Sequence, residues 1–185
     1  MDKLTSFVDW CIYELPPGRA FIPFRYNVNF AKGGMPFFIF GLMLYFNNFS
    51  TAAWLYFCLH GSYGVFWVFR DLVFPDPGFL REQTFMSMIM PWPVALLPYF
   101  IPAWEVMSRR VPQDPSIERI VVCFWLYVFG IVFMVMTDAQ KYLVLRERPK
   151  GKGGLITHCM VGWSRNMNYL GEIMLYASFG ILSQS

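Results

Sequence analysis

Apolar stretches alternate with short polar breaks along this chain, and this pattern sets the number of expected helices. Five stretches are candidates for membrane helical segments: residues 35–46, 51–69, 84–104, 117–136 and 168–182. Residues 117–136 form the cleanest one, because about 20 apolar residues match a hydrocarbon core about 30 Å thick. The pattern therefore predicts an all-α integral membrane protein, a multi-pass bundle of about five such segments.

Polar and proline residues interrupt the predicted segments at defined places. Asn47 and Asn48 end the first segment and Ser50 suits a helix N-cap, so the first two segments are expected to form a helical hairpin. Prolines remove backbone donors, so residues 84–104 are expected to be kinked or broken. Those prolines are Pro91, Pro93, Pro98 and Pro102.

Residues 1–33 differ from the rest and are predicted to be an amphipathic N-terminal arm, because aromatic residues and prolines are interleaved there. The arm either lies in the membrane interface, as aromatic belts do, or packs on a neighbouring protein. Residues 34–185 are predicted to be the membrane domain, with a basic loop at 139–165.

Composition supports the membrane class. The chain is 56% hydrophobic and only 15% charged, against about 25% charged residues in soluble domains. The net charge of +3 is small, which argues against a nucleic-acid partner and leaves membrane lipids as the expected surroundings. Four widely spaced cysteines without a CxxC pair indicate neither a metal site nor a disulfide framework.

The distribution of Lys and Arg predicts the orientation. If the N-terminus is inside, twelve of these residues fall on that side and three on the other, so the N-terminus is expected on the positive-inside face. The inside set is Lys3, Arg19, Arg25, Lys32, Arg70, Arg81, Lys141, Arg146, Arg148, Lys150, Lys152 and Arg165; the other set is Arg109, Arg110 and Arg119.

Residues 164–172, which read Ser-Arg-Asn-Met-Asn-Tyr-Leu-Gly-Glu, place polar groups at the entrance of the last apolar segment. Asn168, Gly171 and Glu172 share one helix face, and polar groups in a bilayer usually have a partner or a ligand. His60, alone in the second segment, is expected to be a core histidine with a satisfied side chain. Tyr63 and Tyr99 are weighed as proton donors but favoured as packing aromatics.

A longer pattern surrounds this cluster. Asp-x-Gln-Lys at 138–141, a basic turn, Gly-Leu at 154–155 and Ser-Arg-x-x-Asn-Tyr-x-Gly-Glu at 164–172 resemble the C-terminal signature of steroid 5α-reductase-like membrane proteins. The resemblance implies a pocket for NADPH on the cytosolic side. It carries over seven cofactor-binding positions: Asp138, Lys141, Arg146, Arg165, Asn168, Tyr169 and Glu172.

Two functions remain open, and the first hypothesis is non-catalytic. The chain ends thirteen residues after Glu172, where the family continues with a further segment, and its first three segments contain no carboxylate in their apolar interior. These features favour a structural or accessory subunit that packs against other integral membrane subunits, with a respiratory or similar energy-converting assembly as host. The mitochondrial inner membrane or the endoplasmic reticulum is the expected location.

The alternative function is an NADPH-dependent reductase of a sterol-like or lipid enone. Such an enzyme transfers hydride to the β-carbon and a proton to the α-carbon. A third hypothesis is a lipid-binding module, in which the proline-broken third segment lines a cleft for a hydrocarbon tail.

Overall fold

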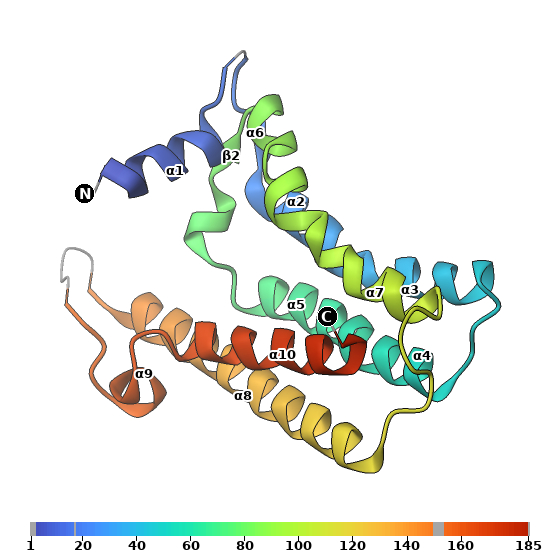
Figure 1. The fold of residues 1–185 in the computed structure, drawn as a ribbon. Helices are drawn as coiled ribbons and strands as arrows, with labels where there is room; N and C mark the ends of the chain where they lie inside the picture. The colour runs from blue at the N-terminus through green and yellow to red at the C-terminus, as the bar shows by residue number, and fades with distance from the viewer. Residues whose placement is uncertain (1–2, 17, 150–153, 185) are drawn as a thin grey trace.

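The chain is mostly helical in its computed structural model, which describes residues 3–16, 18–149 and 154–184 (Figure 1). The α-helices are α1 (Lys3–Tyr13), α2 (Phe24–Gly33), α3 (Met35–Tyr45), α4 (Thr51–Tyr56), α5 (Ser62–Val73), α6 (Phe85–Ile89), α7 (Ile101–Met107), α8 (Ile117–Glu147), α9 (Cys159–Trp163) and α10 (Met167–Ser183). Shorter elements are the π-helical segments η1 (Phe57–Gly61) and η3 (Trp92–Leu96), the 3-10 segments η2 (Pro77–Leu80) and η4 (Pro98–Phe100), and the paired strands β1 (Ile22–Pro23) and β2 (Glu82–Gln83). The helical fold class is confirmed, and the count of five membrane segments stays a prediction.

The longer helices form a bundle built around α10. α8 and α10 lie side by side and run antiparallel (Figure 1), and α10 also contacts α4 and α7. α2 packs on α5, and α3 packs on η1 and α7. The beginning of α10 and the ends of α5 and α8 therefore lie on the same side of the bundle, which is called the polar end below.

Two helices of the described chain are long and apolar enough to cross a membrane. One is Phe24–Tyr45, in which α2 continues into α3, and the other is α8. α8 exposes a row of large apolar side chains, among them Phe124, Trp125 and Phe129. A soluble surface rarely exposes so large an apolar area, so the surface of α8 suits contact with hydrocarbon.

The boundaries of two predicted elements differ from the observed ones. The fourth segment was expected to end at Met136, but α8 continues to Glu147, so its charged last turns are helical as well. The first part of the predicted basic loop is therefore helical, and residues 150–153 of that loop lie outside the described residues. The last ten residues of the predicted arm belong to α2 and continue into the first candidate span.

The predicted turn and breaks are confirmed. Ser50 caps α4 by accepting a hydrogen bond from the backbone N–H of Ala53 at 3.3 Å. Asn48 is fully buried in the turn between α3 and α4 and donates to the carbonyls of Val106 and Met107. The third segment is divided into α6, η3, η4 and α7, as its prolines predict.

Two glycines let the backbones of α8 and α10 approach closely. A Cβ added at Gly171 would lie 2.6 Å from the carbonyl oxygen of Gly130 and 2.7 Å from the backbone nitrogen of Met134. A Cβ at Gly130 would lie 2.8 Å from the carbonyl oxygen of Gly171. Small residues commonly permit such close contact between membrane helices, so this pair fixes α10 against α8.

Replacing Gly171 with Ala should force the two helices apart. We expect Gly171→Ala to lower the free energy of unfolding by about 1–3 kcal/mol, the usual cost of overpacking. The matched control is Gly41→Ala in α3, where an added Cβ meets no atom within 4 Å. That control should leave stability unchanged or raise it by about 0.5–1 kcal/mol. Denaturation in mild detergent measures both, and equal stabilities would contradict the close contact.

Candidate functional site

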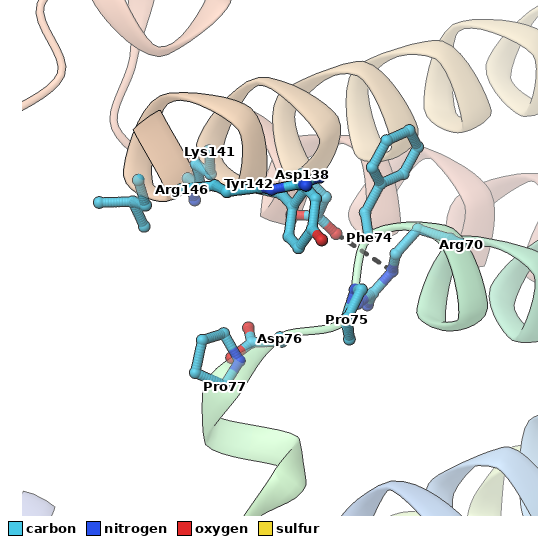
Figure 2. Close-up of a pocket in the computed structure, with 10 residues that line it drawn as sticks. Arg70, Phe74, Pro75, Asp76, Pro77, Asp138, Lys141, Tyr142 and Arg146 are labelled. Carbon is cyan, nitrogen blue, oxygen red and sulfur yellow. Dashed lines mark ion pairs between the residues drawn. The ribbon is translucent and has the colours of Figure 1, made fainter. Parts of the chain in front are cut away.

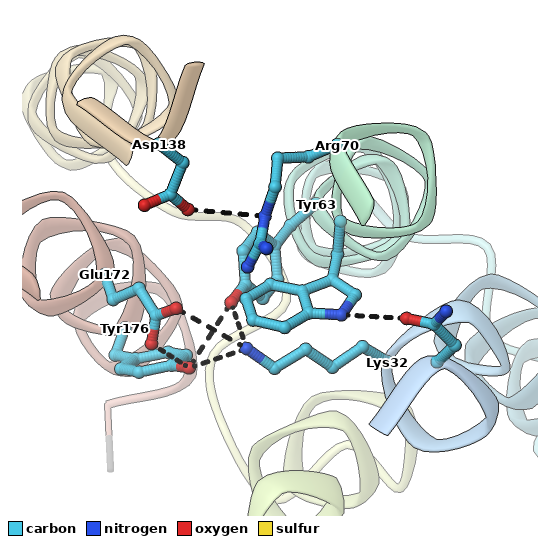
Figure 3. Close-up of polar contacts among 8 residues, drawn as sticks. Lys32, Tyr63, Arg70, Asp138, Glu172 and Tyr176 are labelled. Carbon is cyan, nitrogen blue, oxygen red and sulfur yellow. Dashed lines mark hydrogen bonds and ion pairs between the residues drawn. The ribbon is translucent and has the colours of Figure 1, made fainter. Parts of the chain in front are cut away.

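A buried network of charged and hydroxyl groups lies between α2, α5 and α10 (Figure 3). The Lys32 ammonium, at the end of α2, donates to the Tyr63 hydroxyl at 2.6 Å and to the Tyr176 hydroxyl at 3.4 Å. It also pairs with the Glu172 carboxylate, with 3.7 Å between Nζ and Oε1. Tyr176 in turn donates to Glu172 at 3.1 Å. One ammonium group of α2 therefore contacts side chains from two other helices, α5 and α10.

Aromatic and ionic contacts continue the network toward the polar end. The Lys32 Nζ lies 3.3 Å from the centroid of the Trp67 ring, and the Arg70 guanidinium lies 4.2 Å from the same centroid. Arg70 also pairs with Asp138 of α8, with 3.3 Å between Nε and Oδ2. Cations over aromatic faces are stabilised by the ring quadrupole, so the Trp67 ring attracts both buried cations.

Hydrogen bonds and an ion pair also join Trp67 and Asp71 of α5 to α2. The indole N–H donates to Asn29 at 3.1 Å, and the Asn29 amide donates to Asp71 at 2.7 Å. Asp71 is fully buried and pairs with Arg25 at 2.8 Å. These contacts fix α2 to α5, whereas the contacts of Lys32 also join α2 to α10.

A hollow of about 290 Å³ lies at the polar end, between the end of α5 and the last turns of α8 (Figure 2). Arg70, Lys141 and Arg146 line it together with the carboxylates Asp76 and Asp138. Three cations against two carboxylates give this hollow a positive balance. At 1.5 Å per residue the 31-residue α8 is about 46 Å long, so these last turns extend beyond a 30 Å hydrocarbon core.

The structure brings together five of the seven predicted cofactor positions and leaves two apart. Asp138, Lys141 and Arg146 line the hollow, and Lys141 donates to Asn168 of α10 at 3.1 Å. Glu172 lies in the Lys32 network. The remaining two, Arg165 and Tyr169, are exposed and contact none of the others through a side-chain hydrogen bond or ion pair among the described residues.

Several network residues were missed or misplaced by the sequence reasoning. Lys32 and Arg70 were counted as cations of the inside face, but both are buried within the bundle. Tyr63 is a packing aromatic of the core, as favoured, and its hydroxyl in addition accepts from Lys32. The available signal was helical spacing, because Arg25, Asn29 and Lys32 recur at i, i+4 and i+7 and so lie on one face of α2.

Metal binding finds no support among the residues described. No three His, Cys, Asp or Glu side chains gather into a metal site in that part of the chain. His60 is buried, with Nδ1 2.8 Å from the Tyr56 hydroxyl, whereas its Nε2 has no hydrogen-bond partner within the described structure. The expectation of a satisfied histidine is therefore correct for one ring nitrogen only.

The fold and site define a helical protein with apolar spans and a buried polar network next to a cationic hollow. The chain belongs to the family described as a protein of unknown function (DUF1295), whose profile matches residues 83–185. This match covers more than half of the chain and includes α8 and α10, with Asp138 and Glu172. Searches of curated proteins and of solved structures found no match.

The partly buried ion pair of Lys32 and Glu172 should couple α2 to α10 energetically. We expect Lys32→Met to lower the free energy of unfolding by about 2 kcal/mol or more, because Glu172 then lacks its cation. The double variant with Glu172→Gln should lose less than the sum of the two single losses. Asp9→Asn is the control, because Asp9 pairs with Arg81 at the surface and should cost under about 1 kcal/mol. Strict additivity in detergent denaturation would contradict the coupling.

Proposed function

We propose that this chain is a membrane protein of the steroid 5α-reductase-like class, which binds NADPH and reduces the double bond of a sterol-like or lipid enone. The observation that carries the proposal is the cationic hollow beside the buried Lys32 network. The family profile covers the residues on which the resemblance rests, from Asp138 to Glu172.

The hollow has the chemistry that phosphate groups require. Arg146 and Lys141 stand one to two helical turns beyond Asp138, and Arg70 is held in place by Asp138. Charge-assisted hydrogen bonds from such cations are the usual means of holding phosphate. The hollow is at the lower limit of the usual size of ligand sites, so it suits the phosphate-bearing part of the dinucleotide. Asn168 and Glu172 of α10 are then the amide and carboxylate available to the rest of it.

The Lys32 network supplies a means of holding a proton inside the bundle. When bound, NADPH supplies the hydride of the proposed reaction. The chain itself must provide the proton, and the Tyr63 and Tyr176 hydroxyls lie 3.3 Å apart between an ammonium and a carboxylate. Hydroxyls in that setting can pass a proton along hydrogen bonds.

This proposal ranks the alternative hypothesis from the sequence above the accessory-subunit hypothesis. The reductase was ranked lower from the sequence partly because the first three segments contain no carboxylate in their apolar interior. The carboxylate near the bundle interior comes from α10 instead: Glu172 pairs with Lys32, which precedes the first segment, next to Tyr63 of the second. The hollow also lies at the end of the bundle for which the Lys and Arg count predicts the inside face.

Removing the cations of the hollow should weaken NADPH binding. We expect Lys141→Gln and Arg146→Gln each to raise the Kd for NADPH about tenfold, the loss of one charge-assisted contact. Arg110→Gln, an exposed cation near the beginning of α8, is the matched control and should leave the Kd unchanged. Fluorescence titration of NADPH into the protein in detergent measures the Kd of the native chain and of the three variants. Absent binding, or equal Kd values, would contradict the proposal.

A structural or accessory subunit is the second candidate function, and the N-terminal region favours it. α1 projects from the bundle (Figure 1), and Phe7 and Trp10 on it are 60% and 42% exposed. Phe21 and Tyr26 add exposed aromatic area close by. Aromatic residues are enriched in the cores of protein interfaces, so this surface suits a neighbouring membrane subunit as well as the lipid interface.

Native extraction separates the two candidates. The source membrane, whether mitochondrial inner membrane or endoplasmic reticulum, is solubilised in mild detergent, and the size fractions are analysed by mass spectrometry. The reductase proposal predicts a small species near the chain's 21.7 kDa plus detergent. Migration at many times that mass with a fixed set of companions would favour the subunit function instead.

A further inference from the structure

A groove of about 170 Å³ lies between α4 and the first turns of α8. Leu55 of α4 and Leu59 of η1 line one side, and Leu182 of α10 completes the lining. The other side is formed by α8, where the lining includes Val121 and Phe124, both of them exposed. Every lining side chain is apolar except for the thiol of Cys123, which behaves as a small hydrophobe. The groove therefore suits hydrocarbon.

The volume of the groove suits a slender apolar group. An apolar cavity of about 150 Å³ holds benzene, so this groove has room for about six or seven carbons. Sites for whole drug-sized ligands are larger, about 300–1,000 Å³. The groove also opens on the exposed apolar surface of α8, which suits contact with hydrocarbon. A stretch of a lipid acyl chain therefore fits it.

A half-buried cation, Arg119, lies next to the groove in the first turn of α8. It precedes Cys123 by four positions, which places the two residues on one face of the helix, and its guanidinium lies within electrostatic range of the Cys123 side chain. Residues 120–136 carry no charged side chain. Arg119 is therefore the last charged residue before the apolar part of α8, where long basic side chains reach the headgroup level of a membrane.

Arg119 has no anionic partner within the described structure. Its guanidinium forms no ion pair and no side-chain hydrogen bond there, whereas Arg25, Arg70 and Arg81 each pair with a carboxylate. The neighbouring Glu118 is exposed and does not pair with it. Arg119 does not stabilise α8 either, because the helix dipole disfavours a cation in the first turn. This cation is therefore complementary to an anion from outside the chain.

We infer that the groove and Arg119 together form a binding site for a membrane phospholipid, with an acyl chain in the groove and the phosphate on the guanidinium. Arginine is well suited to phosphate, because its planar fork donates two parallel hydrogen bonds to the phosphate oxygens. A phospholipid carries both the apolar chain and the anion in one molecule, and its phosphate lies at the level at which Arg119 stands.

The phospholipid site is separate from the site of the proposed reaction. The groove shares no residue with the cationic hollow or with the Lys32 network. It also lies beside the beginning of α8, whereas the hollow lies beside the end of that helix. The lipid is therefore a bound partner of the fold, and its binding does not rest on the proposed function.

The test uses the purified full chain in mild detergent and native mass spectrometry, which counts the lipids bound to each molecule. Dioleoyl phosphatidylcholine is titrated in parallel with dioleoylglycerol, which carries the same two chains and no phosphate. We expect the phospholipid to bind with a Kd about tenfold lower, the effect of one charge-assisted contact. Equal Kd values for the two lipids, or the absence of a phospholipid complex, would overturn the inference.

Arg119→Gln tests the contact with the phosphate. This change should raise the Kd for dioleoyl phosphatidylcholine about tenfold and leave the Kd for dioleoylglycerol unchanged, because only the phosphate loses a partner. Arg110→Gln changes an exposed cation of the loop before α8 and is the matched control, which should bind both lipids as the native chain does. A native Kd for the phospholipid in Arg119→Gln would contradict the assignment.

Two neighbouring valines test the groove itself. Val121 lines the groove and Val122 does not, and both are 47% exposed. Val121→Trp should occupy part of the groove and raise the Kd for both lipids severalfold, whereas Val122→Trp should leave both Kd values unchanged. Equal Kd values in the two variants would place the lipid elsewhere and overturn the inference. None of these measurements uses NADPH, so a failure here is separable from a failure of the proposed function.

Discussion

The burial of the Lys32 ammonium is the constraint on which the rest of the structure depends. An ammonium taken out of water needs several partners, because its desolvation costs several kcal/mol. Those partners are Tyr63 and Trp67 on α5 and Glu172 and Tyr176 on α10. No single helix can supply them, so α2, α5 and α10 must meet at one point. The close contact of α10 with α8 at Gly130 then fixes the fourth helix.

This network also stands between the cationic hollow and a pocket walled by aromatic side chains. Arg70 lines the cationic hollow and stacks on Trp67, whose ring also carries Lys32. Tyr176 lines that pocket and contacts Lys32 directly. A phosphate-bearing ligand in the cationic hollow would therefore be separated from the Lys32 network by only a few side chains. That arrangement is the physical reason for preferring a reductase to a purely structural subunit.

Much of the fold could be predicted from the sequence, because long apolar stretches, an Asn pair and prolines act locally. The cluster at Asn168 and Glu172 was likewise visible, since polar groups before an apolar stretch are conspicuous. The partner of Glu172 could not be predicted, because Lys32 lies 140 positions away and resembles an ordinary flanking cation. Arg165 and Tyr169 were included by motif alone; the first lies in the turn before α10, and the exposure of the second depends on how α10 is turned against α8. The continuation of α8 to Glu147 could not be predicted from hydropathy, because the last turns of the helix carry charged residues.

The reactivity of Lys32 tests the central claim most directly. The chain in mild detergent is treated with a small amine-acylating reagent, and mass spectrometry compares Lys32 with Lys141 in the native protein and in Glu172→Gln. The account predicts that native Lys32 resists a reagent concentration that modifies Lys141, and that the loss of Glu172 raises its modification severalfold. A native Lys32 that reacts as readily as Lys141, or a protection that persists without Glu172, would contradict the account.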